Sequence, residues 1–450
     1  MTDHPQAPPP ASASTAIAHV GARRVWDSRG RPTVEAEVRL HDGSVGRAIA
    51  PAGASTGSGE AIDLRDGGTA FGGLDVQRAL AAVDGEIASL LHGRDACEQA
   101  ALDGALIALD GTPDKRRLGG NALVATSMAI AHAAAASRRQ PLWAHLASLD
   151  AGAGGGGERL LPLPEIQVFG GGAHAGRRVD VQDFMVIAVG ARDYAQSLEW
   201  VAEVYRAAGE LMRDAGLLQG VADEGGWWPA FDANDAALEF LLRAIERAGF
   251  TPGQDVAISL DIAASDFGRA GRYTLARDGG RVVDADAMIE MLLGWLARYP
   301  IVAIEDPLAE DDPEGMRRFT AAARAAGHAI QVVADDFICT TAHRIEAAAR
   351  DGACNTALIK PNQAGTLTEA KAALDAARAA GWHSIVSARS GETEDVTIVH
   401  LAVGWGVRQL KVGSFARGER TAKWNEGLRI AEALGQRGGS LAARAAFPWG

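Results

Sequence analysis

Residues 301–307 read IVAIEDP, and this stretch decides the fold. Four apolar residues, typical of a buried strand, run directly into the acidic pair Glu305 and Asp306. Other stretches have the same form, an apolar run that ends at a charged residue. They are VAISLDIA (256–263), IQVVADD (330–336), NTALIKP (355–361), HSIVSAR (383–389) and VRQLKVG (407–413).

Ala-rich segments with helical spacing separate these runs, as parallel βα units require. The charged residue of each run then lies at or near the carboxyl end of its strand, the edge where a (β/α) barrel carries its chemistry. A single charge of this kind is typical of a helix cap or a solvated loop, but a succession favours a converging site. The sequence therefore predicts the α/β class with a C-terminal (β/α) TIM-type barrel. The converging charges are Asp261, Glu305, Asp335, Lys360, Arg389 and Lys411.

A different pattern precedes the glycine-rich stretch AGAGGGGE at residues 151–158. In TVEAEVRL (33–40), apolar and charged residues alternate, which is the period of a half-buried strand. A turn and the polar loop PAGASTGSGE (51–60) follow. We therefore expect an N-terminal α+β lid and dimerisation domain over residues 17–150 and a barrel domain over residues 151–450. The helices expected in the first domain lie near 74–92, 97–110 and 121–139.

The overall charge restricts the partners. A net charge of -13 and a pI near 5.4 argue against nucleic-acid binding, which needs a basic face. Small anions remain possible partners, because local Lys, Arg or metal charge can hold them. No apolar stretch is long enough to span a bilayer, so we expect no membrane association.

Cysteine usage and the N-terminus indicate the compartment. Cys97, Cys339 and Cys354 follow no metal-binding or CxxC spacing, which is typical of free thiols in a reducing compartment. Residues 1–16, MTDHPQAPPPASASTA, contain no Lys or Arg and no apolar core, so they do not form a signal peptide. We predict a disordered tail over residues 1–16 and a cytoplasmic protein.

The converging charges favour one kind of chemistry. Asp261, Glu305 and Asp335 offer carboxylate oxygens, which are the ligands that Mg²⁺ prefers. A lysine beside a metal and another cation has a lowered pKa and can act as a base, while a second lysine can hold a carboxylate. Loss of a proton next to a carboxylate requires concentrated positive charge. The residues therefore indicate proton abstraction alpha to a carboxylate.

These residues lie in stretches that resemble the enolase family, the phosphopyruvate hydratases of glycolysis, from about Arg23 to Leu434. The resemblance implies a Mg²⁺-dependent hydro-lyase that removes water from 2-phosphoglycerate, a small phosphorylated carboxylate, to give an enolpyruvate. It also implies a homodimer. The matching motifs, in order, include DSRGRPTVEAEV (27–38), PAGASTG (51–57), GGAHAG (171–176), VQDFM (181–185), DEGG (223–226), IEDPLAEDD (304–312), LIKPNQAGTLTEA (358–370), SGETEDVTI (390–398) and QLKVG (409–413).

By this resemblance, Lys360 matches the base that removes the C2 proton, and Lys411 matches the partner of the substrate carboxylate. Ser55, in the lid loop, matches the residue that completes a second Mg²⁺ site when the loop closes. The residues that match the main Mg²⁺ ligands are Asp261, Glu305 and Asp335.

On the other side of the implied site, Glu224 matches the acid that helps the C3 hydroxyl leave. Asp183 stands where the family has a glutamate paired with that acid, and it is shorter by one methylene, about 1.5 Å of reach. The residues that match the phosphoryl clamp and the substrate-lining positions are Arg389, Ser390, His174 and Gln182.

Two further departures concern volume. Ala388 stands where the family has an active-site histidine, and Gly170 where it usually has asparagine. Both changes predict a roomier pocket, so an alternative is an enolase paralogue of secondary metabolism that dehydrates a phosphinate analogue to carboxyphosphonoenolpyruvate. Another alternative, a non-catalytic enolase-like binding protein, predicts loss of the metal and base residues, which are present in this sequence.

Overall fold

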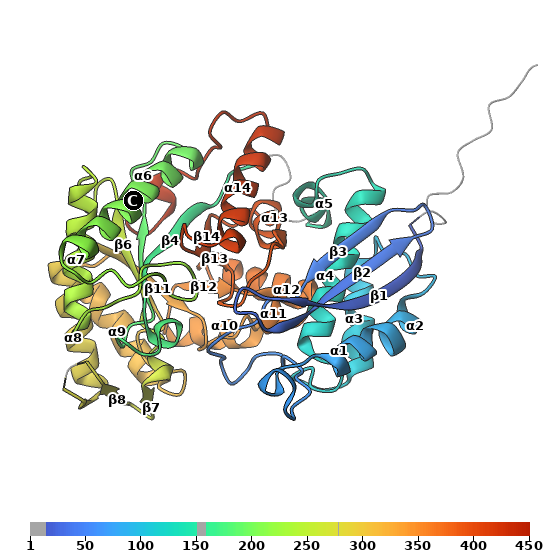
Figure 1. Ribbon diagram of the computed structural model, residues 1–450, viewed down its shortest axis with the longest axis horizontal. Helices are drawn as coiled ribbons and strands as arrows, with labels where there is room; N and C mark the ends of the chain where they lie inside the picture. Colours follow the sequence, from blue (N-terminus) through green and yellow to red (C-terminus); the bar gives the residue numbers. More distant parts are fainter. Residues whose placement is uncertain (1–14, 151–158, 278) are drawn as a thin grey trace, which may run out of the picture.

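The computed structural model describes residues 15–150, 159–277 and 279–450. Within these ranges the chain forms an N-terminal α+β unit and a closed barrel surrounded by helices (Figure 1), which confirms the predicted fold class. Most of the predicted tail and the whole connection at 151–158 lie outside the described residues. At the end of that tail, Ala16 forms a β-bridge with Asp95.

An antiparallel sheet forms one layer of the N-terminal unit. Its order is β1 (Ile17–Trp26), β2 (Pro32–Leu40) and β3 (Val45–Ile49). The alternation predicted for residues 33–40 is confirmed, because Val34, Ala36, Val38 and Leu40 are buried. The sequence did not predict β1, whose buried and exposed residues do not alternate regularly.

Helices form the other layer of this unit, and α4 packs across β2 and β3. The predicted helix at 74–92 consists of α1 (Gln77–Ala82), a π-helical turn (Val83–Ile87) and α2 (Ala88–Leu91). The other predicted helices correspond to α3 (Gln99–Asp110) and α4 (Gly120–Ser137), and a further helix, α5 (Leu142–Leu149), follows them.

The barrel closes in the order β10-β11-β12-β13-β14-β4-β5-β6. The six runs predicted from the sequence all form barrel strands, whereas β4 and β5 were not predicted. The strands are β4 (Leu163–Gly170), β5 (Asp183–Ile187), β6 (Ala257–Asp261), β10 (Ile301–Glu305), β11 (Gln331–Ala334), β12 (Thr356–Ile359), β13 (His383–Ser387) and β14 (Gln409–Gly413).

One strand corrects the expectation of parallel βα units, because β5 runs antiparallel to both β4 and β6. The connection between β4 and β5 contains a short 3-10 turn (Gly172–Ala175) and no α-helix. A parallel pair of strands requires a crossover connection, which is usually a helix. Because this connection lacks one, the chain turns back and places β5 antiparallel to β4, as in a hairpin.

Helices surround the barrel, and α12 and α13 also contact helices of the N-terminal unit. The interior is packed, with Ala303, Val333, Leu358 and Ile385 in one buried cluster. The helices are α6 (Tyr194–Asp214), α7 (Asn234–Arg247), α8 (Ala285–Arg298), α9 (Pro313–Ala325), α10 (Ala342–Asp351), α11 (Pro361–Ala364), α12 (Leu367–Ala379), α13 (Thr397–Gly404) and α14 (Gly418–Ala433). A small sheet, β7 (Gly268–Arg269), β8 (Arg272–Leu275) and β9 (Arg281–Asp284), follows β6.

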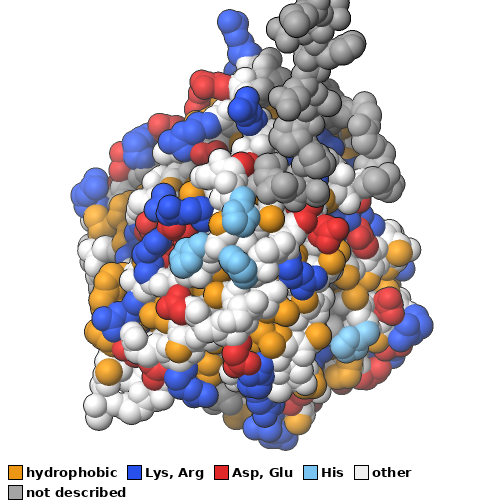
Figure 2. Space-filling model, turned by 90° about the vertical axis from the view of Figure 1, so that its right-hand side faces the viewer, with side chains coloured by type: hydrophobic (Ala, Val, Ile, Leu, Met, Phe, Trp, Pro, Cys, Tyr) orange, Lys and Arg blue, Asp and Glu red, His pale blue; other side chains and the backbone are white. Residues whose placement is uncertain are grey.

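The surface is mixed in character on the face formed by the N-terminal unit. Figure 2 shows this face, where acidic and basic side chains are interspersed and hydrophobic side chains lie between them. Among the helices in the described ranges, none combines the length and the hydropathy needed to cross a membrane.

Candidate active site

One cavity at the carboxyl ends of the barrel strands brings together most of the predicted site residues. Gly53 and Ala54 of the loop at 51–60 also line it, so the cavity lies between the barrel and the N-terminal unit. Glu305 and Asp335 do not line the cavity but bond to lysines that do. The predicted residues in the lining are Ser55, His174, Gln182, Asp183, Glu224, Asp261, Lys360, Arg389, Ser390 and Lys411.

Lys411 forms the centre of the charged cluster. Strand β14 directs it into the barrel, where its Nζ donates to Asp261 Oδ2 at 2.9 Å and to Glu305 Oε2 at 2.7 Å. Asp183 Oδ2 lies 3.6 Å from the same nitrogen. Burial lowers the pKa of Lys411, but the carboxylates of Asp261 and Glu305 outweigh burial and raise the pKa well above its usual value. Lys411 is therefore a fixed positive charge.

Lys360 directly follows β12 and donates a hydrogen bond to Asp335. Gln363 Nε2 donates to the other oxygen of Asp335 at 2.8 Å. Burial lowers the pKa of Lys360, but the carboxylate of Asp335 raises it, and the net effect is a raised pKa. The sequence predicted a lowered pKa for a lysine beside a bound metal, and that stays a prediction. Among the protein's own residues, the carboxylate of Asp335 is the main influence that raises the pKa of Lys360.

The three predicted metal ligands have the donor chemistry that a hard divalent cation requires. All of their ligand atoms are carboxylate oxygens, and Glu305 Oε1 is buried without a hydrogen bond to any described residue. Burial and the neighbouring Asp261 carboxylate raise the pKa of Glu305 well above its usual value. Added positive charge at this point would relieve the repulsion, so Asp261, Glu305 and Asp335 fit a divalent ion.

Two tighter groups of potential ligands are present in the described ranges. Asp306, Asp335 and Asp336 form one, and the ligand atoms of each group lie within 4.8 Å of one another. Asp306 accepts the backbone N–H groups of Asp335 and Asp336 at 2.9 and 2.8 Å, one on each oxygen. Because both of its oxygens are engaged, Asp306 positions the turn that carries Asp335. We therefore prefer the set of Asp261, Glu305 and Asp335. In this structure Lys411 bridges the carboxylates of Asp261 and Glu305, and Lys360 bonds that of Asp335.

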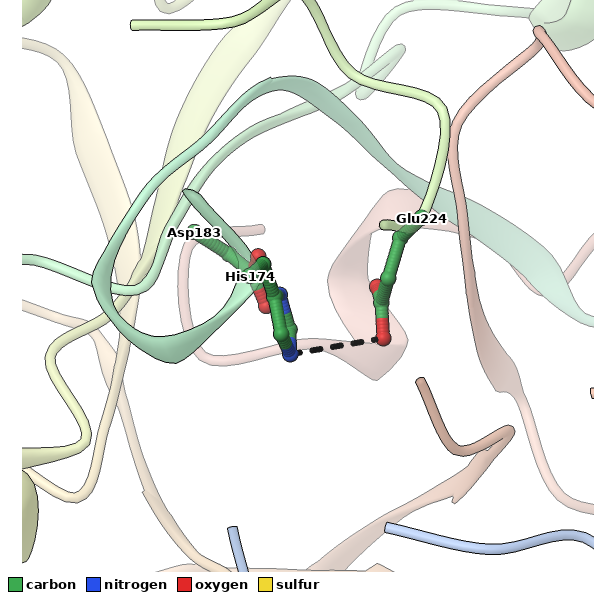
Figure 3. Close-up of side chains that lie close together, drawn as sticks. All are labelled: His174, Asp183 and Glu224. Carbon is green, nitrogen blue, oxygen red and sulfur yellow. Dashed lines mark hydrogen bonds and ion pairs between the residues drawn. The ribbon is translucent and has the colours of Figure 1, made fainter. Parts of the chain in front are cut away.

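The other tight group is His174, Asp183 and Glu224 (Figure 3). His174 lies between the two acids, with Nδ1 3.2 Å from Asp183 Oδ1 and Nε2 3.8 Å from Glu224 Oε1. Burial lowers the pKa of His174, but Glu224 and Asp183 outweigh burial and raise the pKa to about 9. The ring is therefore an imidazolium near neutral pH, and it links both acids.

The pocket is less open than the sequence suggested. A Cβ on Gly170 would lie 2.7 Å from the Cβ of Ala222 and 3.1 Å from Oε1 of Gln167, so other side chains already fill the space that asparagine would use. The predicted extra room at Gly170 is therefore wrong. Ala388, by contrast, lines the cavity. Of the two predicted losses of side-chain volume, only the change from histidine to Ala388 therefore concerns the cavity wall.

The predicted phosphoryl clamp is tied to the lid loop. Arg389 Nη1 lies 2.8 Å from Glu60 Oε2, and its Nη2 donates to the backbone carbonyl of Ser55 at 3.0 Å. Ser390 Oγ accepts from Arg29 Nη1 at 3.2 Å. Neither Glu60 nor Arg29 was predicted as a site residue, although an acid at the end of a Gly/Ser loop was an available signal.

The fold and the site together define a barrel protein whose mouth holds buried acids and lysines and is closed by a loop from an N-terminal α+β unit. Comparison with protein families agrees. Residues 17–146 match the N-terminal domain of enolase, and residues 158–445 match the C-terminal TIM barrel domain of enolase. The chain belongs to the enolase family. The family domains and the acidic clusters that could bind a metal support an enolase-type lyase.

His174 makes stability depend on pH. Because the folded-state pKa of about 9 exceeds the ordinary value of 6.5, the histidine stabilises the fold fully below the ordinary pKa, and this contribution is lost as the pH rises through 9. We expect the melting temperature of His174→Gln to fall below that of the wild type at neutral pH, and the gap to narrow toward alkaline pH. A gap that stays constant across this range would contradict the assignment.

Glu60 fixes the lid loop through Arg389. Glu60→Gln keeps the shape but removes one charge of a buried pair, so amide hydrogen exchange over residues 51–60 should accelerate roughly 10- to 100-fold. The matched control is Glu310→Gln, since Glu310 also bonds this loop, at Ser58, in a more exposed position. It should change exchange only slightly. Equal effects of the two variants would contradict the special role of Glu60.

Proposed function

We propose that the protein is a Mg²⁺-dependent hydro-lyase. It removes the proton alpha to a carboxylate and eliminates water from 2-phosphoglycerate or a close analogue, giving an enolpyruvate product. The observation that carries this proposal is the meeting of two kinds of group in one cavity. One kind is a pair of lysines, Lys360 just after β12 and Lys411 on β14, and the other is the acid Glu224 with His174. Such a pair is what elimination of a proton and a hydroxyl from adjacent carbons requires.

Lys360 is the proposed base. It lines the cavity from the end of β12, and its amine must be neutral when it accepts the proton. Lys411 holds the substrate carboxylate, because its pKa keeps it charged throughout. When bound by Asp261, Glu305 and Asp335, Mg²⁺ supplies positive charge that lowers the pKa of a nearby lysine and stabilises a dianion.

Glu224 is the proposed acid for the leaving hydroxyl. His174 Nε2 lies 3.8 Å from its carboxylate, and Asp183 holds the opposite ring nitrogen at 3.2 Å. An imidazolium in this position would hold and orient the Glu224 carboxyl group. Gln182 Nε2 donates to Asp261 Oδ2 at 3.0 Å and would orient that carboxylate, while Ser55 of the lid is the proposed ligand of a second Mg²⁺.

The cavity wall beside Arg389 supports a second candidate substrate. Arg389 and Ser390 are the proposed phosphoryl clamp. Ala388, which lines the cavity beside them, is smaller than the histidine of the family, which would give a substrate more room there. An analogue with an extra group on phosphorus, such as a phosphinate that yields carboxyphosphonoenolpyruvate, would use this room. The same lysine base and Glu224 acid would serve both substrates.

Three further proposals rest on the resemblance and composition alone. They are a homodimer, a cytoplasmic location, and the absence of nucleic-acid and membrane partners. The binding-protein alternative is the weaker one, because buried charges without a catalytic or metal partner are costly to keep in a fold.

The test of the proposed function is turnover of 2-phosphoglycerate with Mg²⁺, followed by the ultraviolet absorbance of the enol product. Lys360→Met should lower the turnover number roughly 10²- to 10⁴-fold, because it removes the base. Lys115→Met is a matched control, since Lys115 is a buried lysine that pairs with Glu369 at 2.8 Å and does not line the cavity. It should retain near wild-type turnover.

Two outcomes decide between the candidates. Brisk wild-type turnover of 2-phosphoglycerate would remove the reason for the phosphinate substrate. Slow turnover of 2-phosphoglycerate, with fast turnover of the phosphinate analogue, would favour the second candidate. If Lys360→Met retained full turnover of the preferred substrate, the proposed mechanism would be wrong.

A further inference from the structure

We infer that Gln167 is a positioning residue that fixes the carboxylates of Asp183 and Glu224 relative to each other. This inference rests on the proposed function, because Glu224 is the proposed acid. Gln167 lies on β4 and is completely buried. It does not line the cavity, so it acts on the reaction through the two acids rather than by touching the substrate.

The contacts of Gln167 use both ends of its amide. Nε2 donates to Asp183 Oδ1 and lies 3.5 Å from Glu224 Oε2, so the amino group faces both acids. Oε1 accepts the backbone N–H of Gly226 at 2.9 Å, within the loop that carries Glu224. These contacts define the orientation of the amide. In the flipped orientation, the amide oxygen would face two carboxylates and the amino group would face the N–H of Gly226.

The position of Gln167 follows from the strand pattern. Residues of β4 alternate between the helical layer and the barrel interior, and β4 pairs with β5, the strand that begins at Asp183. The missing side chain at Gly170 leaves space that Gln167 and Ala222 occupy. A longer residue at 170 would therefore displace the amide from the acids.

Gln167 also explains how a shorter acid can serve at position 183. An aspartate reaches about 1.5 Å less far than a glutamate. Its Oδ2 lies toward Lys411 at 3.6 Å, and its Oδ1 receives both His174 and Gln167. Without Gln167, His174 would be the one described side chain that contacts the carboxylates of both Asp183 and Glu224. Displacements near 1 Å cost roughly 10²-fold in rate, so this link is important for the acid step.

The experiment compares two steps of the reaction in Gln167→Asn, which keeps the amide but shortens its reach. With 2-phosphoglycerate and Mg²⁺ in D₂O, elimination should slow roughly 10- to 100-fold with little change in KM. Exchange of the alpha hydrogen should continue near the wild-type rate, because Gln167 contacts neither lysine. The ratio of exchange to elimination therefore rises.

The matched control is Gln331→Asn. Gln331 is also a buried glutamine of the barrel interior, but it pairs with Gln409 at 2.6 Å, at the first residue of β11, far from the carboxyl ends. The same shortening there should leave the ratio unchanged. An equal loss of exchange and elimination in Gln167→Asn, or no loss of either, would overturn the inference.

A crystal structure of Gln167→Asn keeps the inference testable whatever the substrate is. If the wild type neither exchanges nor eliminates with 2-phosphoglycerate, that substrate is wrong, while the positioning role is decided by the structure. Carboxylates of Asp183 or Glu224 displaced relative to the wild type support the role. Unmoved carboxylates overturn it.

Discussion

The structure depends on the ammonium group of Lys411. The barrel buries Asp183, Asp261 and Glu305 around one point, and carboxylates in such surroundings cost several kcal/mol each unless positive charge is present. Lys411 lies within 3.6 Å of all three and supplies that charge. A fourth buried acid, Glu165, adds to the negative potential around it. At this edge of the barrel, the negative charge of the buried acids is therefore compensated by the positive charge of the lysines.

A buried ion pair of the same kind connects the N-terminal unit to the barrel. Arg389, which follows the neighbouring strand β13, pairs with Glu60 of the N-terminal loop. Lys360 pairs with Asp335. The partners of the buried charges thus come from both the N-terminal unit and the barrel. Under the proposed function, a substrate with a phosphoryl group and a carboxylate would compete for Arg389 and Lys411, and its binding would then be linked to the position of the lid loop.

The sequence predicted those features that follow from local pattern. Runs such as IVAIEDP identified the strands and the charged edge. It did not predict β4, because Pro164, Glu165 and Gln167 interrupt the apolar run. Nor did it predict the ion pairs, since partners such as Lys411 and Asp261 are 150 residues apart, lie on strands that are not neighbours, and meet only inside the closed barrel. Glu60 and Gln167 were missed for this reason, and Gly170 was misjudged because its neighbours in space are not its neighbours in sequence.

The proposed ligands of the divalent ion are the carboxylates that the lysines hold in this structure, those of Asp261, Glu305 and Asp335. Calorimetric titration of Mg²⁺ into the wild type, Glu305→Gln and Glu224→Gln tests this assignment most directly. We expect Glu305→Gln to weaken Mg²⁺ binding more than about 10-fold and Glu224→Gln to retain it. Retained affinity in Glu305→Gln with loss in Glu224→Gln would place the ion at the His174 group and contradict the account.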